Sequence, residues 1–181
     1  SYTNFGELIN ESVKEHERGS QLRQLSFKGA IQFTNASLTY PEQSEPTLKQ
    51  LNLSINAGEK VAIVGRIGSG KTSVLRLIAG LYDANEGSVK IDSSDVTHIH
   101  PDDLRQNIGV VMQTPFLFSG SLKENLLLGN PNATDDQIHE ASKIVGVDQI
   151  ATELPNGFET ILAERGQQLS GGQRQAICIA R

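Results

Sequence analysis

Alternating apolar and polar positions begin at residue 31. Ile31 and Phe33, and later Leu38 and Tyr40, are separated by single residues, which predicts a β-strand with one buried face. Residues 48–55 repeat the pattern and predict a second extended segment. Only the short loop PEQSEP joins the two segments, so we expect an antiparallel β-subdomain at one edge of the fold.

A different pattern, short runs of consecutive apolar residues, follows further along the chain. The runs at 61–64 (VAIV) and 108–112 (IGVVM) predict buried strands, and residues 88–92 predict a short one. Helical spacing appears at 135–145, and Pro101 suits the first position of another helix. Strands that alternate with helices predict an α/β fold with a largely parallel central sheet.

Residues 65–72, GRIGSGKT, fit the phosphate-binding pattern G-x-x-x-x-G-K-[ST] between a predicted strand and a predicted helix. Glycines let the backbone curl so that successive N–H groups point inward, and the positive end of the helix adds to the same cavity. In that pattern Lys71 reaches the β- and γ-phosphates, and the Thr72 hydroxyl ligates Mg²⁺. The helix that follows would turn apolar side chains to the core: Val74, Leu75, Leu77 and Ile78.

Composition narrows the class of protein. The 181 residues carry a net charge of −5, with 37% hydrophobic and 20% charged residues, which is typical of one soluble domain. The acidic balance and the lack of basic runs argue against nucleic acid as a partner. No apolar run is long enough to span a bilayer. Residues 1–26 combine a short amphipathic helix, around Phe5 to Val13, with a polar linker.

The string LSGGQ at residues 169–173 is a second motif and far more specific, arising by chance in roughly one chain per several thousand. With this string the chain resembles the nucleotide-binding domain of ATP-binding-cassette (ABC) transporters, over about residues 30–181. The resemblance implies a P-loop ATPase domain at residues 27–181, with an antiparallel β-subdomain and a helical signature subdomain. It also implies that the signature helix meets the γ-phosphate of ATP held by a second, head-to-tail ATPase domain.

Further positions match the family one by one. Tyr40 stands where an aromatic ring stacks on adenine, and Gln113 where a glutamine ligates Mg²⁺ and orients the attacking water. Lys71 and Gln113 are therefore the expected catalytic residues, and Thr72 and Gln113 the expected metal ligands. The expected ATP-binding residues are Tyr40, Gly65, Gly68, Ser69, Gly70, Lys71, Thr72, Ser73, Gln113, Ser170, Gly171, Gly172 and Gln173.

Three segments point to an exporter. Residues 160–166 (TILAERG) partly match the exporter segment T-E-V-G-E-R-G, which senses the transmembrane domain. Residues 29–37 and 65–71 resemble type I secretion ATPases. Such ATPases lie at the cytoplasmic face of the bacterial inner membrane, and they work with a periplasmic adaptor and a secreted protein cargo. Other exporters of lipid, peptide or drug, a soluble ABC ATPase acting on nucleic acid or ribosomes, and a non-hydrolysing fragment are the alternatives.

The sequence ends at Arg181, inside the expected signature helix. In the family the Walker B strand, the catalytic glutamate and the switch histidine come after this point. We therefore expect an incomplete domain that follows a membrane domain, and a phosphate-loop strand without one neighbour. Such a strand would leave ladder edges and apolar surface exposed. We also expect this chain alone to bind ATP and not to hydrolyse it.

Overall fold

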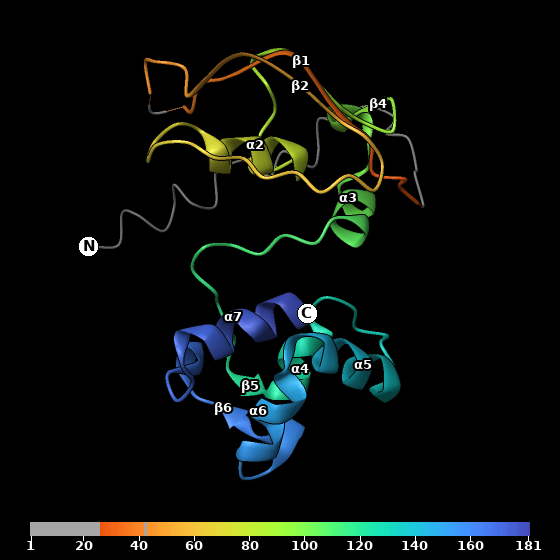
Figure 1. The fold of residues 1–181 in the computed structure, drawn as a ribbon, viewed down its shortest axis with the longest axis vertical. Coiled ribbons are helices and arrows are strands. Elements are labelled where there is room, and N and C mark those ends of the chain that lie inside the picture. The colour runs from red at the N-terminus through yellow and green to blue at the C-terminus, as the bar shows by residue number, and fades with distance from the viewer. Residues whose placement is uncertain (1–25, 42) are drawn as a thin grey trace, which may run out of the picture. The chain divides into compact units, whose positions relative to one another are not determined.

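The computed structural model describes residues 26–41 and 43–181 (Figure 1). It forms two compact units, unit 1 up to Gly109 and unit 2 from Val110 onward. The amphipathic segment that the sequence predicts around Phe5 to Val13 lies outside the described residues. Within the described part of the chain, no helix has the length and apolar character needed to cross a bilayer.

Unit 1 is built on a four-stranded sheet in the order β2-β1-β3-β4. Every pairing in it is antiparallel, and β1 is central between β2 and β3. The predicted antiparallel β-subdomain is therefore confirmed. The strands are β1 (Ile31–Leu38), β2 (Leu48–Ile55), β3 (Glu86–Ile91) and β4 (Ser94–Asp95).

An irregularity in β1 explains why its apolar spacing changes midway. Ile31 and Phe33 occupy odd positions, whereas Ala36 and Leu38 occupy even ones, yet Phe33, Ala36 and Leu38 are all buried. The pairing with β2 shifts register between Phe33 and Ala36, and Asn35 adopts a left-handed φ of 47° there. A bulge of this kind moves the following side chains back to the same face.

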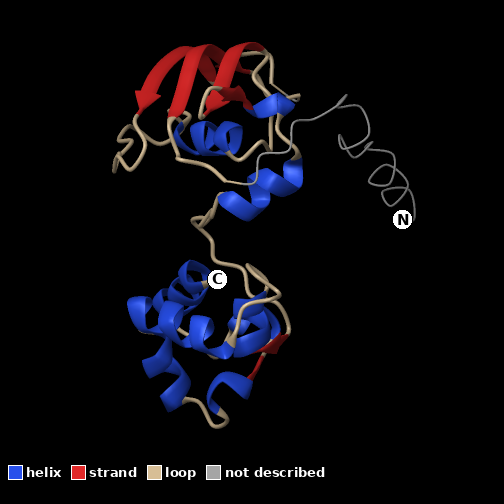
Figure 2. Ribbon diagram, turned by 90° about the vertical axis from the view of Figure 1, so that its right-hand side faces the viewer, coloured by secondary structure: helices blue, strands red, loops and turns tan. Residues whose placement is uncertain are grey.

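The helices of unit 1 lie on one face of this sheet (Figures 1 and 2). Helix α2 (Lys71–Ile78) buries Val74 and Leu77 in the core that the strands share. Leu75 is 49% exposed, so its predicted place in the core is wrong; it lies on the solvent side of the helix. The turn η2 (Val96–His98) and helix α3 (Pro101–Asn107) follow, with Pro101 in the first turn as predicted.

Neither of the two apolar runs predicted as buried strands forms a strand, and apart from the half-buried Ile108 their residues are exposed. Val61, Ile63 and Val64 are 44%, 40% and 90% exposed, and residues 110–112 are 41–47% exposed. A strand needs a neighbour for its N–H and C=O groups, and among the described residues neither run pairs with another strand. The parallel central sheet is accordingly not formed by residues 26–41 and 43–181, and apolar surface is exposed at both runs.

Unit 2 is mainly helical. Three of its helices begin with a capping box, in which a hydroxyl and a Glu or Gln three residues later bond each other's backbone N–H. These caps define the starts of the helices around one apolar core. The elements are β5 (Gly120–Ser121), α4 (Leu122–Leu127), α5 (Asp135–Val145), α6 (Val147–Glu153), η3 (Gly157–Glu159), β6 (Ile161–Leu162), η4 (Glu164–Gly166) and α7 (Gly171–Ala180).

A carboxylate clamp holds the entry to β1. Asp92, in the left-handed turn after β3 with a φ of 49°, accepts hydrogen bonds from the backbone N–H groups of Lys28, Gly29 and Ala30. Burial acts to raise the pKa of the Asp92 carboxyl, but these bonds and the Lys28 charge lower it overall. The clamp therefore needs the ionised form.

We predict that Asp92→Asn lowers the unfolding free energy by about 1 kcal/mol at neutral pH, a value reduced for solvent screening. The pKa of Asp92 in the folded protein lies below the ordinary 3.8. The ionised carboxylate therefore contributes its full stabilisation above about pH 4, and this contribution is lost as the pH falls through the lowered pKa. Urea unfolding of both proteins between about pH 3 and 7 measures the difference. The clamp would be contradicted if the two proteins differed in unfolding free energy as much at pH 3 as at pH 7. The control is Glu45→Gln, because Glu45 forms an exposed ion pair with Lys49.

Candidate functional site

The predicted phosphate-binding loop leads directly into α2. Gly68 and Gly70 have left-handed φ values of 82° and 86°, a conformation that side-chain-bearing residues rarely adopt. Gly70 is the N-cap of α2, and no side chain of the described residues hydrogen-bonds to this helix end. The first-turn N–H groups therefore remain available, and the helix dipole adds positive potential there, so the end is suited to an anion.

Gly70 is also required by packing. A Cβ at this position would lie 2.6 Å from Leu48 Cδ2 and 3.1 Å from the Thr47 carbonyl oxygen. The start of α2 is thus pressed against the start of β2, and only glycine allows the approach. Gly68 differs, because a Cβ there meets nothing within 4 Å. Its requirement for glycine comes from backbone conformation alone.

The Lys71 side chain folds back over the loop. Its Nζ donates hydrogen bonds to the carbonyl oxygens of Gly65 and Arg66, at 2.9 and 2.7 Å, and approaches Ser69 Oγ at 3.4 Å. The ammonium group is therefore held beside the loop by backbone acceptors. This places a positive charge and the open helix end at the same cavity, which is the arrangement that phosphate groups require.

A cavity of about 280 Å³ opens at this loop. Its volume and its mixed polar and aromatic lining fit part of a nucleotide. The cavity brings together seven residues that the sequence predicted for the site. It adds Gln43 and Thr47, which the sequence analysis did not identify and which only their closeness to Tyr40 along the chain could have indicated. The lining residues are Tyr40, Gln43, Thr47, Gly68, Ser69, Gly70, Lys71, Thr72 and Ser73.

Tyr40 is fixed by three contacts. Its hydroxyl lies 2.8 Å from Ser73 Oγ and accepts a hydrogen bond from Arg76 Nη1 at 3.1 Å. Its ring meets that of Tyr82 in a T-shaped contact, with centroids 4.9 Å apart. The sequence predicted Tyr40 and Ser73 for the site but neither Arg76 nor Tyr82. Neither of these two lines the cavity, so they hold Tyr40 from outside it.

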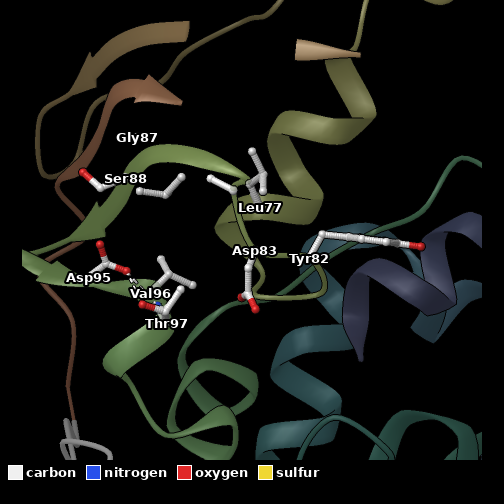
Figure 3. Close-up of a pocket in the computed structure, with 10 residues that line it drawn as sticks. Leu77, Tyr82, Asp83, Gly87, Ser88, Asp95, Val96 and Thr97 are labelled. Atoms are coloured by element: carbon white, nitrogen blue, oxygen red, sulfur yellow. Dashed lines mark hydrogen bonds between the residues drawn. The ribbon is translucent and has the colours of Figure 1, made fainter. Parts of the chain in front are cut away.

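A smaller hollow of about 90 Å³ lies between α2, β3 and η2 and includes Tyr82 in its lining (Figure 3). Asp95 points into this region, but its carboxylate accepts hydrogen bonds from the backbone N–H and the hydroxyl of Thr97, at 3.0 and 2.6 Å. It therefore serves as the cap of η2. This hollow has no open helix end and no lysine, unlike the cavity at the phosphate-binding loop.

The expected metal ligands lie in different units. Thr72 is exposed in the first turn of α2, and its hydroxyl is the hard oxygen donor that suits Mg²⁺ beside phosphate oxygens. Gln113 is exposed in unit 2. No group of three or more His, Cys, Asp or Glu among the described residues could hold a metal alone. The donors present fit a cation that is held mainly by the nucleotide.

The signature residues open α7 in unit 2. Ser170 is the N-cap; its Oγ accepts from the Gln173 N–H, and Gln173 Oε1 accepts from the Ser170 N–H. The capping box leaves the Ser170 hydroxyl proton free to donate. Gly171 and Gly172 are exposed, and a Cβ on either would meet no atom closer than 4.0 Å. Packing within unit 2 therefore does not require these two glycines.

We predict that Gly70→Ala destabilises unit 1 more than Gly68→Ala does. Both changes place a side chain at positive φ, at a cost of about 1–2 kcal/mol. Gly70→Ala adds overpacking against Leu48 and Thr47, worth about 1–3 kcal/mol more. Urea unfolding of the two variants measures the difference. Equal losses would show that the close approach to β2 carries no free energy.

Comparison with known proteins supports the reading of these motifs. The ABC transporter family model matches residues 48–181. ABC transporter B family member 4 of Dictyostelium discoideum is 42% identical over 97% of this chain and 23% of its own length. The ABC transporter ATP-binding protein YfiB of Bacillus subtilis is 40% identical over 98% of this chain and 30% of its own length.

A solved structure, a bacterial Atm1-family ABC exporter with ATP bound, superposes with a TM-score of 0.87 at 30% identity. It covers 98% of this chain, and this chain covers 31% of it. The chain thus spans less than a third of the length of each of these relatives. The predicted class of ABC-type ATPase domain is confirmed: this chain belongs to the ABC transporter family and forms an ATP-binding domain.

Proposed function

We propose that this chain is the ATP-binding part of an exporter that hydrolyses ATP to drive transmembrane export. The observation that carries the proposal is the cavity at the start of α2, where an open helix end, Lys71 and the Tyr40 ring converge. Tyr40 offers a flat amphipathic ring for the adenine, and Lys71 and the loop N–H groups bind the phosphates. The exporter assignment is supported by the relatives, which include the Atm1-family exporter.

Mg²⁺ bound with the nucleotide would neutralise phosphate charge, and Thr72 and Gln113 are the proposed ligands. Lys71 and Gln113 are the proposed catalytic residues. Lys71 leaves the carbonyl oxygens of Gly65 and Arg66 for phosphate oxygens, which are stronger acceptors. Gln113 orients the attacking water.

A second ATPase domain is the proposed partner, arranged head to tail. The exposed glycines of the signature support it, because they have no packing role in unit 2 and allow a close approach of another molecule to the start of α7. Ser170 would donate its free proton to the γ-phosphate held by the partner domain. Closure and reopening of this pair would drive the membrane domain, at the cytoplasmic face of the membrane.

Residues 160–166 are the proposed contact with the transmembrane domain. Ile161, the first residue of β6, is 68% exposed, whereas Thr160 is buried and its hydroxyl accepts from the Asn156 N–H at 3.0 Å. Arg165 adopts a left-handed φ of 58° and is exposed together with Glu164. The buried residue anchors the segment, and the exposed ones are available for a partner.

We predict that this chain binds Mg-ATP and that Lys71→Ala weakens binding at least about tenfold, because a charged hydrogen-bond donor to phosphate is lost. Lys60→Ala, which removes an exposed lysine from the same unit, is the matched control and leaves affinity unchanged. Isothermal titration calorimetry measures the Mg-ATP affinity of both variants and of the parent chain. No steady hydrolysis is expected of this chain alone, since no Asp or Glu of the described residues lines the cavity, where it could orient the attacking water. Equal affinities for the Lys71 variant and the parent would refute the site.

Within the exporters, we propose type I protein secretion, with a periplasmic adaptor and a secreted protein cargo. Residues 29–37 and 65–71 support it through their resemblance to that subgroup. Multidrug export is the second candidate, because a Staphylococcus aureus relative named as a putative multidrug export protein is 42% identical over 85% of this chain. The two classes differ in cargo, a large protein or a small molecule.

Deletion of the gene in its source organism separates the two classes. For type I secretion, we expect at least one large protein to disappear from the culture medium while drug susceptibility stays the same. A gene carrying Lys71→Ala should fail to restore secretion, whereas Lys60→Ala should restore it. Unchanged secretion together with increased drug sensitivity would assign the domain to multidrug export instead.

A further inference from the structure

Helix α2 carries two side chains that reach the Tyr40 hydroxyl. Ser73 and Arg76 are three residues apart, so they lie on the same face of the helix. Ser73 Oγ lies 2.8 Å from the Tyr40 hydroxyl oxygen, and Arg76 Nη1 lies 3.1 Å from it. The same helix begins at the phosphate-binding loop. The proposed base-stacking residue is thus tied to the element that binds the phosphates.

Arg76 also contacts two aromatic rings. Its guanidinium carbon lies 5.6 Å from the centroid of the Tyr40 ring and 5.9 Å from that of Tyr82. The T-shaped contact between the two rings completes the group. A planar cation beside two partly buried rings adds to their packing. Tyr40 is therefore restrained both at its hydroxyl and at its ring.

The donor inventory sets a direction for the hydrogen bonds. Arginine can only donate, so the Tyr40 oxygen accepts from Arg76. The Tyr40 hydroxyl keeps its own proton and can donate it to Ser73 Oγ, which lies 2.8 Å away. The Ser73 proton remains for a further acceptor, and Ser73 lines the cavity of the phosphate-binding loop. Hydrogen bonds in a chain of this kind strengthen one another.

We propose that Arg76, supported by Tyr82, is a positioning residue for nucleotide binding, which acts through Tyr40. It holds the Tyr40 ring at the wall of the cavity and orders the chain Arg76–Tyr40–Ser73 so that Ser73 donates to a phosphate oxygen. This inference rests on the proposed ATP site. It assigns a role to two residues, Arg76 and Tyr82, that lie outside both sequence motifs and outside the cavity lining.

The experiment is a double-mutant cycle on Mg-ATP affinity, measured by calorimetry with the whole chain. Arg76→Met is expected to weaken binding about tenfold, and Tyr40→Phe, which keeps the ring and removes the hydroxyl, by a similar factor. Tyr40→Phe already breaks the hydrogen-bonded chain, so in that background Arg76→Met removes only the contacts with the rings and should weaken binding by clearly less than the tenfold expected in the parent. Arg76→Lys keeps a charged donor and should restore part of the loss.

The matched control is Arg105→Met, which removes an exposed arginine from α3 in the same unit and should leave affinity unchanged. Circular dichroism verifies that each variant is folded. Fully additive losses, or an Arg76→Met affinity within about twofold of the parent while Lys71→Ala abolishes binding, would overturn the inference and leave the ATP site standing. A parent chain that binds no ATP would overturn both.

Discussion

The close approach of α2 to β2 is the constraint on which the site depends. Gly70 lies where any side chain would collide with Leu48 and the Thr47 carbonyl oxygen, so the helix begins directly against the sheet. The same residue has no side chain with which to cap the helix, and the first-turn N–H groups are left for a ligand. One glycine thus fixes the position of the helix end and keeps it open. The Lys71 ammonium and the cavity follow from that placement.

The two sequence motifs use helix ends in different ways. The start of α2 lacks a side-chain cap among the described residues, whereas the start of α7 carries a complete capping box from Ser170 and Gln173. An uncapped end at the wall of an open cavity can bind phosphate because its N–H groups have no competing side-chain acceptor. A capped end is already stable by itself. The start of α7 therefore keeps its structure without a ligand, and its exposed glycines leave room for a second molecule that completes the site.

Much of this arrangement could be predicted from sequence, because local rules determine it. The spacing of apolar residues predicted the antiparallel pair β1–β2 and helix α5, and the glycine pattern predicted the phosphate-binding loop. The bulge at Asn35 depends on pairing with neighbouring strands, which no local pattern shows. The runs at 61–64 and 108–112 have the composition of buried strands, but a strand needs a neighbouring strand, and none of the described residues supplies one.

The partners of Tyr40 show the same limit within the site. The sequence indicated Tyr40 through a family pattern, but Arg76 and Tyr82 carry no motif and come together with Tyr40 only when α2 packs on the sheet. Their contacts make the Tyr40 position a consequence of where α2 lies, and Gly70 sets where α2 lies. The adenine end and the phosphate end of the proposed site therefore share one rigid support. A displacement of α2 would change the contacts of Tyr40 and the phosphate-binding loop together, which is what a site proposed for a base and a polyphosphate in one molecule requires.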